Sequence, residues 1–227
     1  MTKQRPARFP LVVFDWDGTL MDSLGSMVAC ATEAFREIDL VPPAPERIRG
    51  AIGLGLGEVA AHILPDADRA VRARLIAAYR QLWLGRYRHH VALYEGAAEA
   101  LALLKDRGHR LAIATGRSRT GLTHDLAATG LTTAFATTRT ADDAPSKPDP
   151  AMLLAVLEEL EMSARAALMV GDTTYDLEMA SRAGVEAVGV LTGSHSRRAL
   201  DGFKPRACLE TVADLPAYLE SAQAPAP

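Results

Sequence analysis

The chain has 227 residues, 48% of them hydrophobic and 23% charged, which is ordinary for a globular protein long enough to bury a sizeable core. The net charge of −3 gives no basic footprint for nucleic acid, and no apolar run approaches the roughly 18 residues that span a bilayer, so we expect neither nucleic acid nor membrane as a partner. The two cysteines, Cys30 and Cys208, lack zinc-site spacing, and the basic N-terminus lacks the apolar segment of a signal peptide, which predicts a cytoplasmic protein.

The first informative stretch is LVVFDWDGTLMDS, residues 11–23. It opens with a short apolar run of strand-favouring types, which predicts a strand buried on both faces. In an extended chain, residues two apart project to the same side, so Asp15 and Asp17 should face one space while Trp16 turns away. At about 3.3 Å of rise per residue their alpha carbons lie roughly 6 to 7 Å apart. A phosphoryl group with its metal ion fits between two such carboxylates.

Further polar groups follow these aspartates. Gly18 lets the backbone turn sharply, Thr19 adds a hydroxyl, and Ser23 is placed to cap a following helix. The whole sequence DWDGTLMDS, residues 15–23, resembles the first motif of the haloacid dehalogenase superfamily in its large phosphatase branch, DxDGTxxDS.

From residue 24 to about residue 90 the pattern is helical. In the run at 66–90, apolar residues recur at three- and four-residue steps, which predicts one helix face in contact with a core. They are Val71, Leu75, Tyr79, Leu82 and Trp83. Arginines lie opposite them and indicate either a solvated face or a surface that attracts anions. They are Arg69, Arg72, Arg74, Arg80, Arg86 and Arg88.

Three glycines, Gly53, Gly55 and Gly57, lie between these helices. A dinucleotide-binding fingerprint would need GxGxxG after a clear strand and an acid about 20 residues later, and this stretch meets neither condition. Two interpretations stay open. The segment is either a flexible loop between helices or, as the family resemblance implies, a substrate-facing loop of an inserted helical cap.

After residue 94 the chain alternates between helix and strand. We expect helices at 97–107, 120–129, 150–161 and 177–183, each followed by a strand, then a strand at 208–211 and a short last helix. Repeated units with apolar strands predict a parallel sheet covered on both faces. The expected fold class is therefore α/β, with a Rossmann-like core similar to that of the haloacid dehalogenases at 1–20 and 94–220, an all-helical cap inserted at 21–93 and a disordered tail at 221–227.

Ligands of open parallel sheets bind beyond the carboxyl ends of the strands, and polar residues fall there. Thr115, Gly116 and Arg117 resemble the family's second motif, in which a Ser or Thr hydroxyl and neighbouring amides hold a phosphoryl oxygen. Many members have Asn at the position of Gly116, which makes Arg117 the candidate replacement donor. Lys147, in SKPDP, resembles the third-motif lysine, whose ammonium offsets charge on the nucleophile and the phosphoryl group.

The segment AALMVGDTTYD brings Asp172 and Asp176, which match the fourth motif, GDxxxD. Asp172 closes a buried strand, and Asp176 lies on the same side of a helical turn that begins there. Hard oxygen ligands of this kind suit Mg²⁺, which keeps several waters and uses one or two carboxylates with phosphate oxygens. The histidines without metal-ligand spacing are expected to be surface or packing residues, namely His89, His90, His124 and His195.

The resemblance implies a role for each motif residue. Asp15 would attack phosphorus to form an aspartyl-phosphate, while Asp17 would protonate the leaving oxygen and later activate water; Lys147 would assist them. The implied Mg²⁺ site uses Asp15, the carbonyl of Asp17 and Asp172, with Asp176 nearby. The implied substrate-binding residues are Gly18, Thr19, Thr115, Gly116, Arg117 and Lys147.

Other chemistries of the superfamily fit less well. Dehalogenases lack the second aspartate of the first motif, which is Asp17 here. Phosphonatases form a Schiff base through a cap lysine, and no lysine occurs between Lys3 and Lys105. The cap size and glycine loop look most like phosphoglycolate phosphatase, with inorganic pyrophosphatase, sugar-phosphate phosphatase and phosphomutase as alternatives. A catalytically idle binding protein is only a remote alternative, because such a scaffold has no need for the full set of Asp15, Asp17, Lys147, Asp172 and Asp176. We expect a small phosphorylated metabolite as substrate and a monomer or homodimer.

Overall fold

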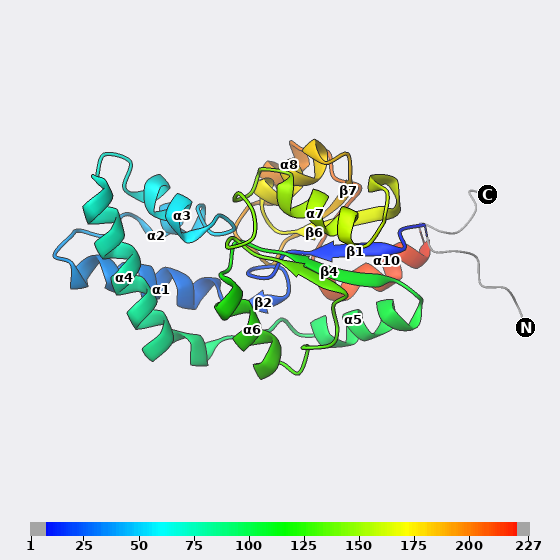
Figure 1. Cartoon of the computed structure of the whole chain (residues 1–227), viewed down its shortest axis with the longest axis horizontal. Coiled ribbons are helices and arrows are strands. Elements are labelled where there is room, and N and C mark those ends of the chain that lie inside the picture. Colours follow the sequence, from blue (N-terminus) through cyan, green and yellow to red (C-terminus); the bar gives the residue numbers. More distant parts are fainter. Residues whose placement is uncertain (1–7, 222–227) are drawn as a thin grey trace, which may run out of the picture.

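The structure is a computed structural model and describes residues 8–221. Its centre is a parallel sheet of six strands in the order β5-β4-β1-β6-β7-β8 (Figure 1). The strands are β1 (Leu11–Phe14), β4 (Arg110–Ala114), β5 (Thr137–Arg139), β6 (Ala167–Gly171), β7 (Glu186–Val190) and β8 (Cys208–Leu209). The first motif therefore follows a central strand, which has neighbours on both sides. The predicted α/β fold with a parallel sheet is confirmed.

Helices cover both faces of this sheet, as Figure 1 shows. Val12 and Phe14 pack in one core with α5 (Ala97–Asp106), α6 (Arg119–Ala128) and α10 (Leu215–Ser221). Leu11 and Val13 pack in a second core with α7 (Ala151–Glu159), α8 (Thr174–Arg182) and α9 (Arg197–Asp201). All four residues of β1 are fully buried, as expected for a strand that is covered on both faces.

A helical insertion, residues 24–90, follows the first motif and forms the part drawn on the left of Figure 1. It contains α1 (Leu24–Glu37), α2 (Pro45–Arg49), α3 (Leu56–Ile63), α4 (Arg69–Gly85) and the 3-10 helix η1 (Tyr87–His90). These helices share a small core of their own around Phe35, Ile63 and Leu75. The two connections to the sheet lie side by side, because β2 (Met21–Asp22) pairs antiparallel with β3 (Ala92–Leu93). The region expected to be all-helical thus begins and ends with a short strand.

Several boundaries differ from the sequence expectation. Helix α8 starts three residues earlier than expected, because the Thr173 hydroxyl accepts a hydrogen bond from the Asp176 amide and the Asp176 carboxylate accepts one from the Thr173 amide. Helix α9 and the 3-10 helices η2 (Ala164–Ala166) and η3 (Val212–Asp214) were not expected. Ser221, placed in the tail, ends α10, and the rest of that tail lies outside the described residues.

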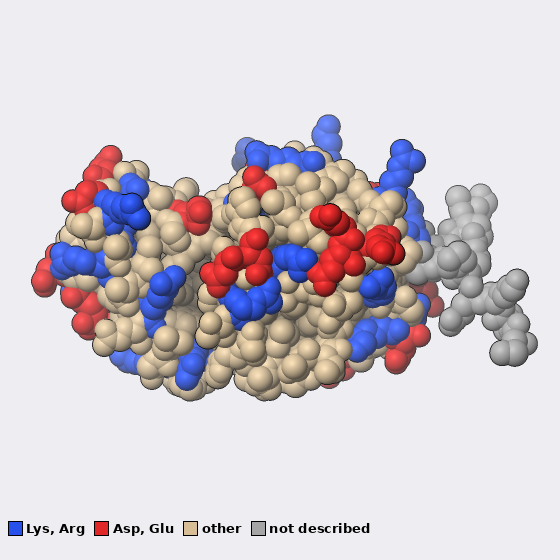
Figure 2. Space-filling view, viewed as in Figure 1, with Lys and Arg blue, Asp and Glu red and all other residues tan. Residues whose placement is uncertain are grey.

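The outer surface carries acidic and basic side chains interspersed over both parts of the molecule on the face drawn in Figure 2. On that face the molecule narrows to a waist between the helical insertion and the part that contains the sheet. Among the helices of residues 8–221, none combines the length and the apolar character that a bilayer crossing requires.

Candidate active site

Three buried carboxylates meet at the carboxyl edge of the sheet. Asp15 follows β1, Asp172 follows β6, and Asp176 lies in the first turn of α8. Each is at most 1% exposed, and one oxygen of each lies within 4.8 Å of the others. Because β1 and β6 are parallel neighbours, their ends bring together residues far apart in sequence. The structure thus gathers three of the four residues expected at a metal site.

Lys147 is the cation of this cluster. Its Nζ lies 2.7 Å from Asp15 Oδ1 and 2.6 Å from Asp176 Oδ1, and the side chain is completely buried. Burial alone lowers the pKa of Lys147, but the Asp15 and Asp176 carboxylates raise it above the ordinary value for lysine. Lys147 is therefore a fixed positive charge between Asp15, the candidate nucleophile, and Asp176. It lies beside the nucleophile, as the resemblance to the third-motif lysine implies.

One lysine does not balance three buried carboxylates. Burial raises the pKa of Asp15 well above its usual range, and burial with the Asp176 charge raises the pKa of Asp172 to about 7. Asp172 accepts hydrogen bonds from the Thr19 hydroxyl and the Ser194 amide, but within the described chain the Lys147 ammonium is the only donor at the Asp15 carboxylate. Excess buried negative charge and an Asp15 oxygen without a donor fit a divalent metal ion that prefers hard oxygen ligands.

Glycines allow the backbone to approach Asp172 closely. A Cβ at Gly18, whose φ is +83°, would lie 2.5 Å from Asp172 Oδ2, and one at Gly193 would lie 1.8 Å from the same atom. The Gly18 amide donates to the Met21 carbonyl, and the Thr19 hydroxyl is used by Asp172, so both expected substrate-binding residues have protein partners here. Gly193 belongs to a loop after β7 that the sequence analysis missed, although a glycine at a strand end is a recognisable signal.

Asp17 lies outside the carboxylate cluster. Arg117 binds it with two nitrogens, Nε at 2.9 Å from Oδ2 and Nη2 at 2.6 Å from Oδ1. The Ser23 hydroxyl donates to Asp17 Oδ1 at 2.5 Å. Ser23 does precede α1, but its side chain makes no capping hydrogen bond, so the expected cap is wrong. The hydroxyl orients the second aspartate of the motif instead.

Besides Asp17, the Arg117 guanidinium contacts two further side chains, Asp125 and Trp83. Its Nη1 lies 3.0 Å from Asp125 Oδ2, and its guanidinium lies over the Trp83 ring at 5.1 Å from the centroid. Trp16, which turns away from the site as expected, donates from Nε1 to Asp125. A donor role for Arg117 toward a phosphoryl group stays a prediction, because in this structure the guanidinium orients Asp17. Asp125 was missed, since no local motif marks it as the partner of Arg117 or of Trp16, which is 109 residues away.

Thr115 and Gly116 follow β4 at the same edge. The buried Thr115 hydroxyl accepts a hydrogen bond from the Arg117 amide at 3.2 Å. A Cβ at Gly116 would lie 2.5 Å from the Leu54 carbonyl oxygen and 2.8 Å from that of Gly53. Backbone cannot move away as a flexible side chain can, so the close approach of the helical insertion requires glycine here. This explains why the chain lacks the asparagine that many members of the resembled family carry.

Several hydrogen bonds hold the helical insertion against the sheet. The Gly55 amide donates to Ser146 Oγ at 2.7 Å, and the Tyr175 hydroxyl donates to the Gly50 carbonyl at 3.0 Å. His195 Nε2 lies 3.2 Å from the same Gly50 oxygen, which makes His195 a packing residue, as expected. The structure therefore shows the insertion in contact with the loops at the strand ends, in a closed arrangement.

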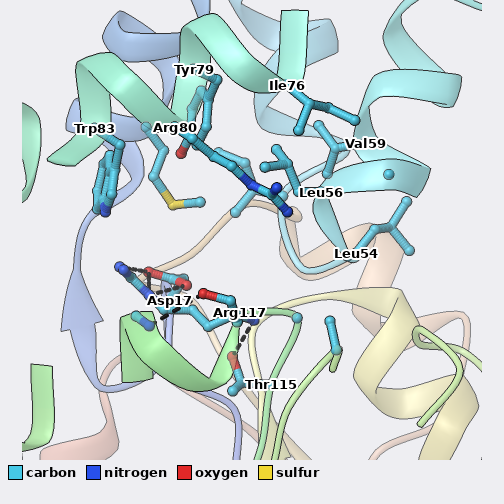
Figure 3. A pocket seen from close by; sticks show the side chains of 18 of the residues that line it. Asp17, Leu54, Leu56, Val59, Ile76, Tyr79, Arg80, Trp83, Thr115 and Arg117 are labelled. Carbon is cyan, nitrogen blue, oxygen red and sulfur yellow. Dashed lines mark hydrogen bonds and ion pairs between the residues drawn. The ribbon is translucent and has the colours of Figure 1, made fainter. Parts of the chain in front are cut away.

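A cavity of about 710 Å³ lies between the helical insertion and these strand ends (Figure 3). Its floor is formed by Asp15, Asp17, Thr115 and Arg117, and its roof by the loop at 52–55 with α3 and α4. The glycine-rich segment lines the cavity, which favours the substrate-facing interpretation over a free loop. Part of the expected core face of α4 also lines it, because Leu75 and Tyr79 border the cavity while packing in the insertion's core, and Trp83 borders the cavity as well.

The arginines of α4 and η1 were expected to form either a solvated face or a surface that attracts anions, and the structure contains both kinds. Arg80 and Arg88 line the cavity. Arg72 and Arg74 donate to backbone carbonyls, and Arg86 pairs with Glu33 at the outer surface. The sequence pattern alone could not separate these positions, because it does not show which parts of the helix surface face the cavity.

Comparison with known proteins agrees with this geometry. Residues 12–190 match the family model described as haloacid dehalogenase-like hydrolase. The chain is 36% identical to a Dickeya dadantii protein named "Probable phosphatase IndB", with 91% of each chain covered. It is 32% identical to a Rhodospirillum rubrum protein named "Phosphoglycolate phosphatase", with 92% of this chain and 90% of the relative covered.

A solved structure has the same fold. The crystal structure of a hydrolase from Pseudomonas syringae superposes with a TM-score of 0.86 at 28% identity, covering 95% of this chain and 99% of the other. The family match spans the first motif, the second motif, Lys147 and both aspartates of the fourth motif, and the structure brings those motifs to one edge of the sheet. The chain belongs to the haloacid dehalogenase-like hydrolase family.

Proposed function

We propose that this chain is a Mg²⁺-dependent phosphatase that hydrolyses a small phosphate monoester through an aspartyl-phosphate on Asp15. The observation that carries this proposal is the Asp15 carboxylate itself, which is buried at the cavity floor and has, among the described residues, only the Lys147 ammonium as a donor. One Asp15 oxygen pairs with Lys147 at 2.7 Å, and the other has no donor within the described residues and can attack phosphorus. The names of the relatives from Dickeya dadantii and Rhodospirillum rubrum support a phosphatase, and the latter makes phosphoglycolate the first metabolite to test.

The residues divide the reaction between them. An Asp15 oxygen attacks phosphorus in line as the bond to the leaving oxygen breaks, and Asp17 gives that oxygen its proton. Asp17 then takes a proton from the water that hydrolyses the aspartyl-phosphate, which releases phosphate and restores Asp15. Arg117 and Ser23 keep Asp17 oriented for both transfers, because they hold its two oxygens.

Charge on the phosphoryl group must be offset throughout. Lys147 supplies one buried positive charge next to Asp15, and Thr115 with its neighbouring amides faces the same space. A Mg²⁺ ion held by Asp15, the Asp17 carbonyl and Asp172, with Asp176 nearby, would supply the remaining positive charge when bound. The covalent step divides a very slow hydrolysis into two displacements, and enhancements for phosphate monoesters reach about 10²¹-fold.

Removal of divalent metal should abolish activity. We expect excess chelator to stop hydrolysis of a generic aryl phosphate, Mg²⁺ to restore it, and Ca²⁺ to inhibit, because the larger and looser shell of Ca²⁺ misplaces the attacking carboxylate. Thermal denaturation gives an independent measurement, since Mg²⁺ at about 100 times its dissociation constant should stabilise the wild type by about 2.7 kcal/mol. Asp172→Asn should lose most of that stabilisation. Full activity in excess chelator would contradict the proposal.

Gly116→Ala should weaken catalysis through the helical insertion. The new methyl group would meet the Leu54 carbonyl, so the closed arrangement must open by a few tenths of an ångström or more. We expect kcat/KM to fall by about 10- to 100-fold, since small misplacements of binding elements cost rates of this order. Gly25→Ala is the matched control, because a Cβ at Gly25 meets nothing within 4 Å, and it should keep wild-type kinetics. Equal kinetics for the two variants would show that closure does not limit the reaction.

A further inference from the structure

The cavity is much larger than a phosphoryl group with a two-carbon acid requires. Its volume of about 710 Å³ falls in the range of about 300 to 1,000 Å³ that is typical of sites for drug-sized ligands. The insertion is already closed over the strand ends when the cavity has this volume. The Gly55 amide bonds to Ser146, and the Gly50 carbonyl is in contact with Tyr175 and His195. The closed form therefore retains room for a substantial organic group.

The roof of this cavity is chiefly apolar. Figure 3 shows its side chains, which come from the loop at 52–55 and from α3 and α4, namely Leu54, Leu56, Val59, Ile76, Tyr79 and Trp83. Most of them are only half-buried, so apolar surface faces the cavity instead of a packed neighbour. Apolar surface in contact with water is costly, and an apolar ligand group would remove that cost.

The cations of the floor are already paired. Arg117 uses its nitrogens on Asp17 and Asp125, and Lys147 lies between Asp15 and Asp176. A carboxylate two carbons from phosphorus would have to lie close to the floor, where the cations are occupied. Arg80 and Arg88 line the cavity from the insertion, and in Figure 3 Arg80 belongs to the α4 side of the cavity, across from Asp17 and Arg117.

We propose that the preferred substrates are phosphate monoesters of alcohols with a bulky, largely apolar body. The phosphoryl group lies at Asp15, and the body contacts the aliphatic and aromatic roof between α3 and α4. This inference rests on the proposed phosphatase function for the position of the phosphoryl end. It assigns the roof as the part of the site that selects the alcohol, and it ranks phosphoglycolate as a poor substrate.

A series of alkyl phosphates tests this preference. We would measure kcat/KM with Mg²⁺ for ethyl, hexyl and 2-phenylethyl phosphates and for phosphoglycolate, because the three alcohols leave with similar ease and differ in apolar surface. Each buried methylene contributes about fourfold and hexyl has four more than ethyl, so hexyl phosphate should exceed ethyl phosphate by up to about 250-fold. Equal values for ethyl and hexyl phosphates, or a higher value for phosphoglycolate than for hexyl phosphate, would overturn the inference.

Binding of unreactive analogues separates this inference from the phosphatase proposal. Ethylphosphonate, hexylphosphonate and 2-phenylethylphosphonate cannot be hydrolysed in the same way, and calorimetry with Mg²⁺ gives their affinities directly. Affinity that rises with the size of the apolar body while no ester is hydrolysed would contradict the phosphatase proposal but support the preference of the cavity for apolar groups. Affinity that does not change along the series would overturn the preference, whatever the hydrolysis assays give.

Variants on one helix locate the effect. Ile76→Trp fills part of the cavity and should lower the ratio of hexyl to ethyl phosphate kcat/KM by about 10-fold. Gln81→Trp is the matched control, because Gln81 is an exposed α4 residue that does not line this cavity, and it should keep the wild-type ratio. If Ile76→Trp does not fold, Leu54→Asn changes the polarity of the roof at a half-buried position and should lower the same ratio. A ratio that no roof variant lowers contradicts the proposal.

Discussion

Asp15→Asn should abolish hydrolysis of every phosphate ester, lowering kcat by about 10⁴- to 10⁶-fold, because an amide neither attacks phosphorus nor neutralises a metal ion. The loss should be the same for alkyl and aryl esters, since each depends on the same nucleophile. Acid-quenched mass spectrometry of the wild type should find the phosphate on the peptide that contains Asp15. The exposed Asp22, seven residues later in the same motif, provides the control, and Asp22→Asn should stay within about twofold of wild type.

The Asp15→Asn variant should remain folded. Burial raises the pKa of Asp15, so its charged form is disfavoured in the folded state, and within residues 8–221 the ion pair with Lys147 is the only side-chain contact of its oxygens that an amide would weaken. Lys147 keeps Asp176 as a partner. Chelator-treated Asp15→Asn should therefore match or exceed the wild-type free energy of unfolding in urea. A large loss of stability would mean that Asp15 holds the fold together, and the activity loss would then say little about chemistry.

The sheet and its acidic edge could be predicted from the sequence because their signals are local. Residues 11–14 form a fully buried strand, and parallel strands end at one edge, so polar residues after each strand had to converge. Asp15 and Asp172 directly follow such strands, whereas Lys147 was expected only from its resemblance to the family's third motif. The helix that carries Asp176 differs from the expectation, because the capping interaction between Asp176 and Thr173 makes α8 start earlier than expected.

The surroundings of Asp17 could not be predicted in the same way. Arg117, in the loop after β4, pairs with Asp17, and Asp125 of α6 pairs with Arg117. Nothing in the spacing of a motif encodes which aspartates a distant arginine will bind. Helical periodicity had a similar limit. The step of 3.6 residues identifies the apolar face of α4 but does not distinguish a face that packs from one that borders a cavity, and Leu75 and Tyr79 do both.

Asp17→Asn should separate the two chemical steps. The amide keeps the shape of the side chain and leaves Asp15 intact, but it can neither deliver nor accept the proton, which is typically worth about 10²- to 10⁴-fold in rate. Alkyl phosphates need that proton to leave and should lose activity in the first step. An aryl phosphate scarcely needs it, so its first step should survive better than hydrolysis of the aspartyl-phosphate. Rapid mixing should then show a burst of about one equivalent of phenol per site.

The neighbours of Asp17 decide whether this result reports proton transfer. Arg117 keeps Asp125 in the variant, so its position over Trp83 should be maintained. Ser23→Ala removes a hydrogen bond to Asp17 and leaves the acid, and we expect a loss of about 10-fold or less with no burst. Phosphate trapped on Asp15 in Asp17→Asn, but not in Ser23→Ala, would assign the proton to Asp17. An equal loss on alkyl and aryl esters without trapped phosphate would instead mean that Asp17 serves to hold Arg117 in place.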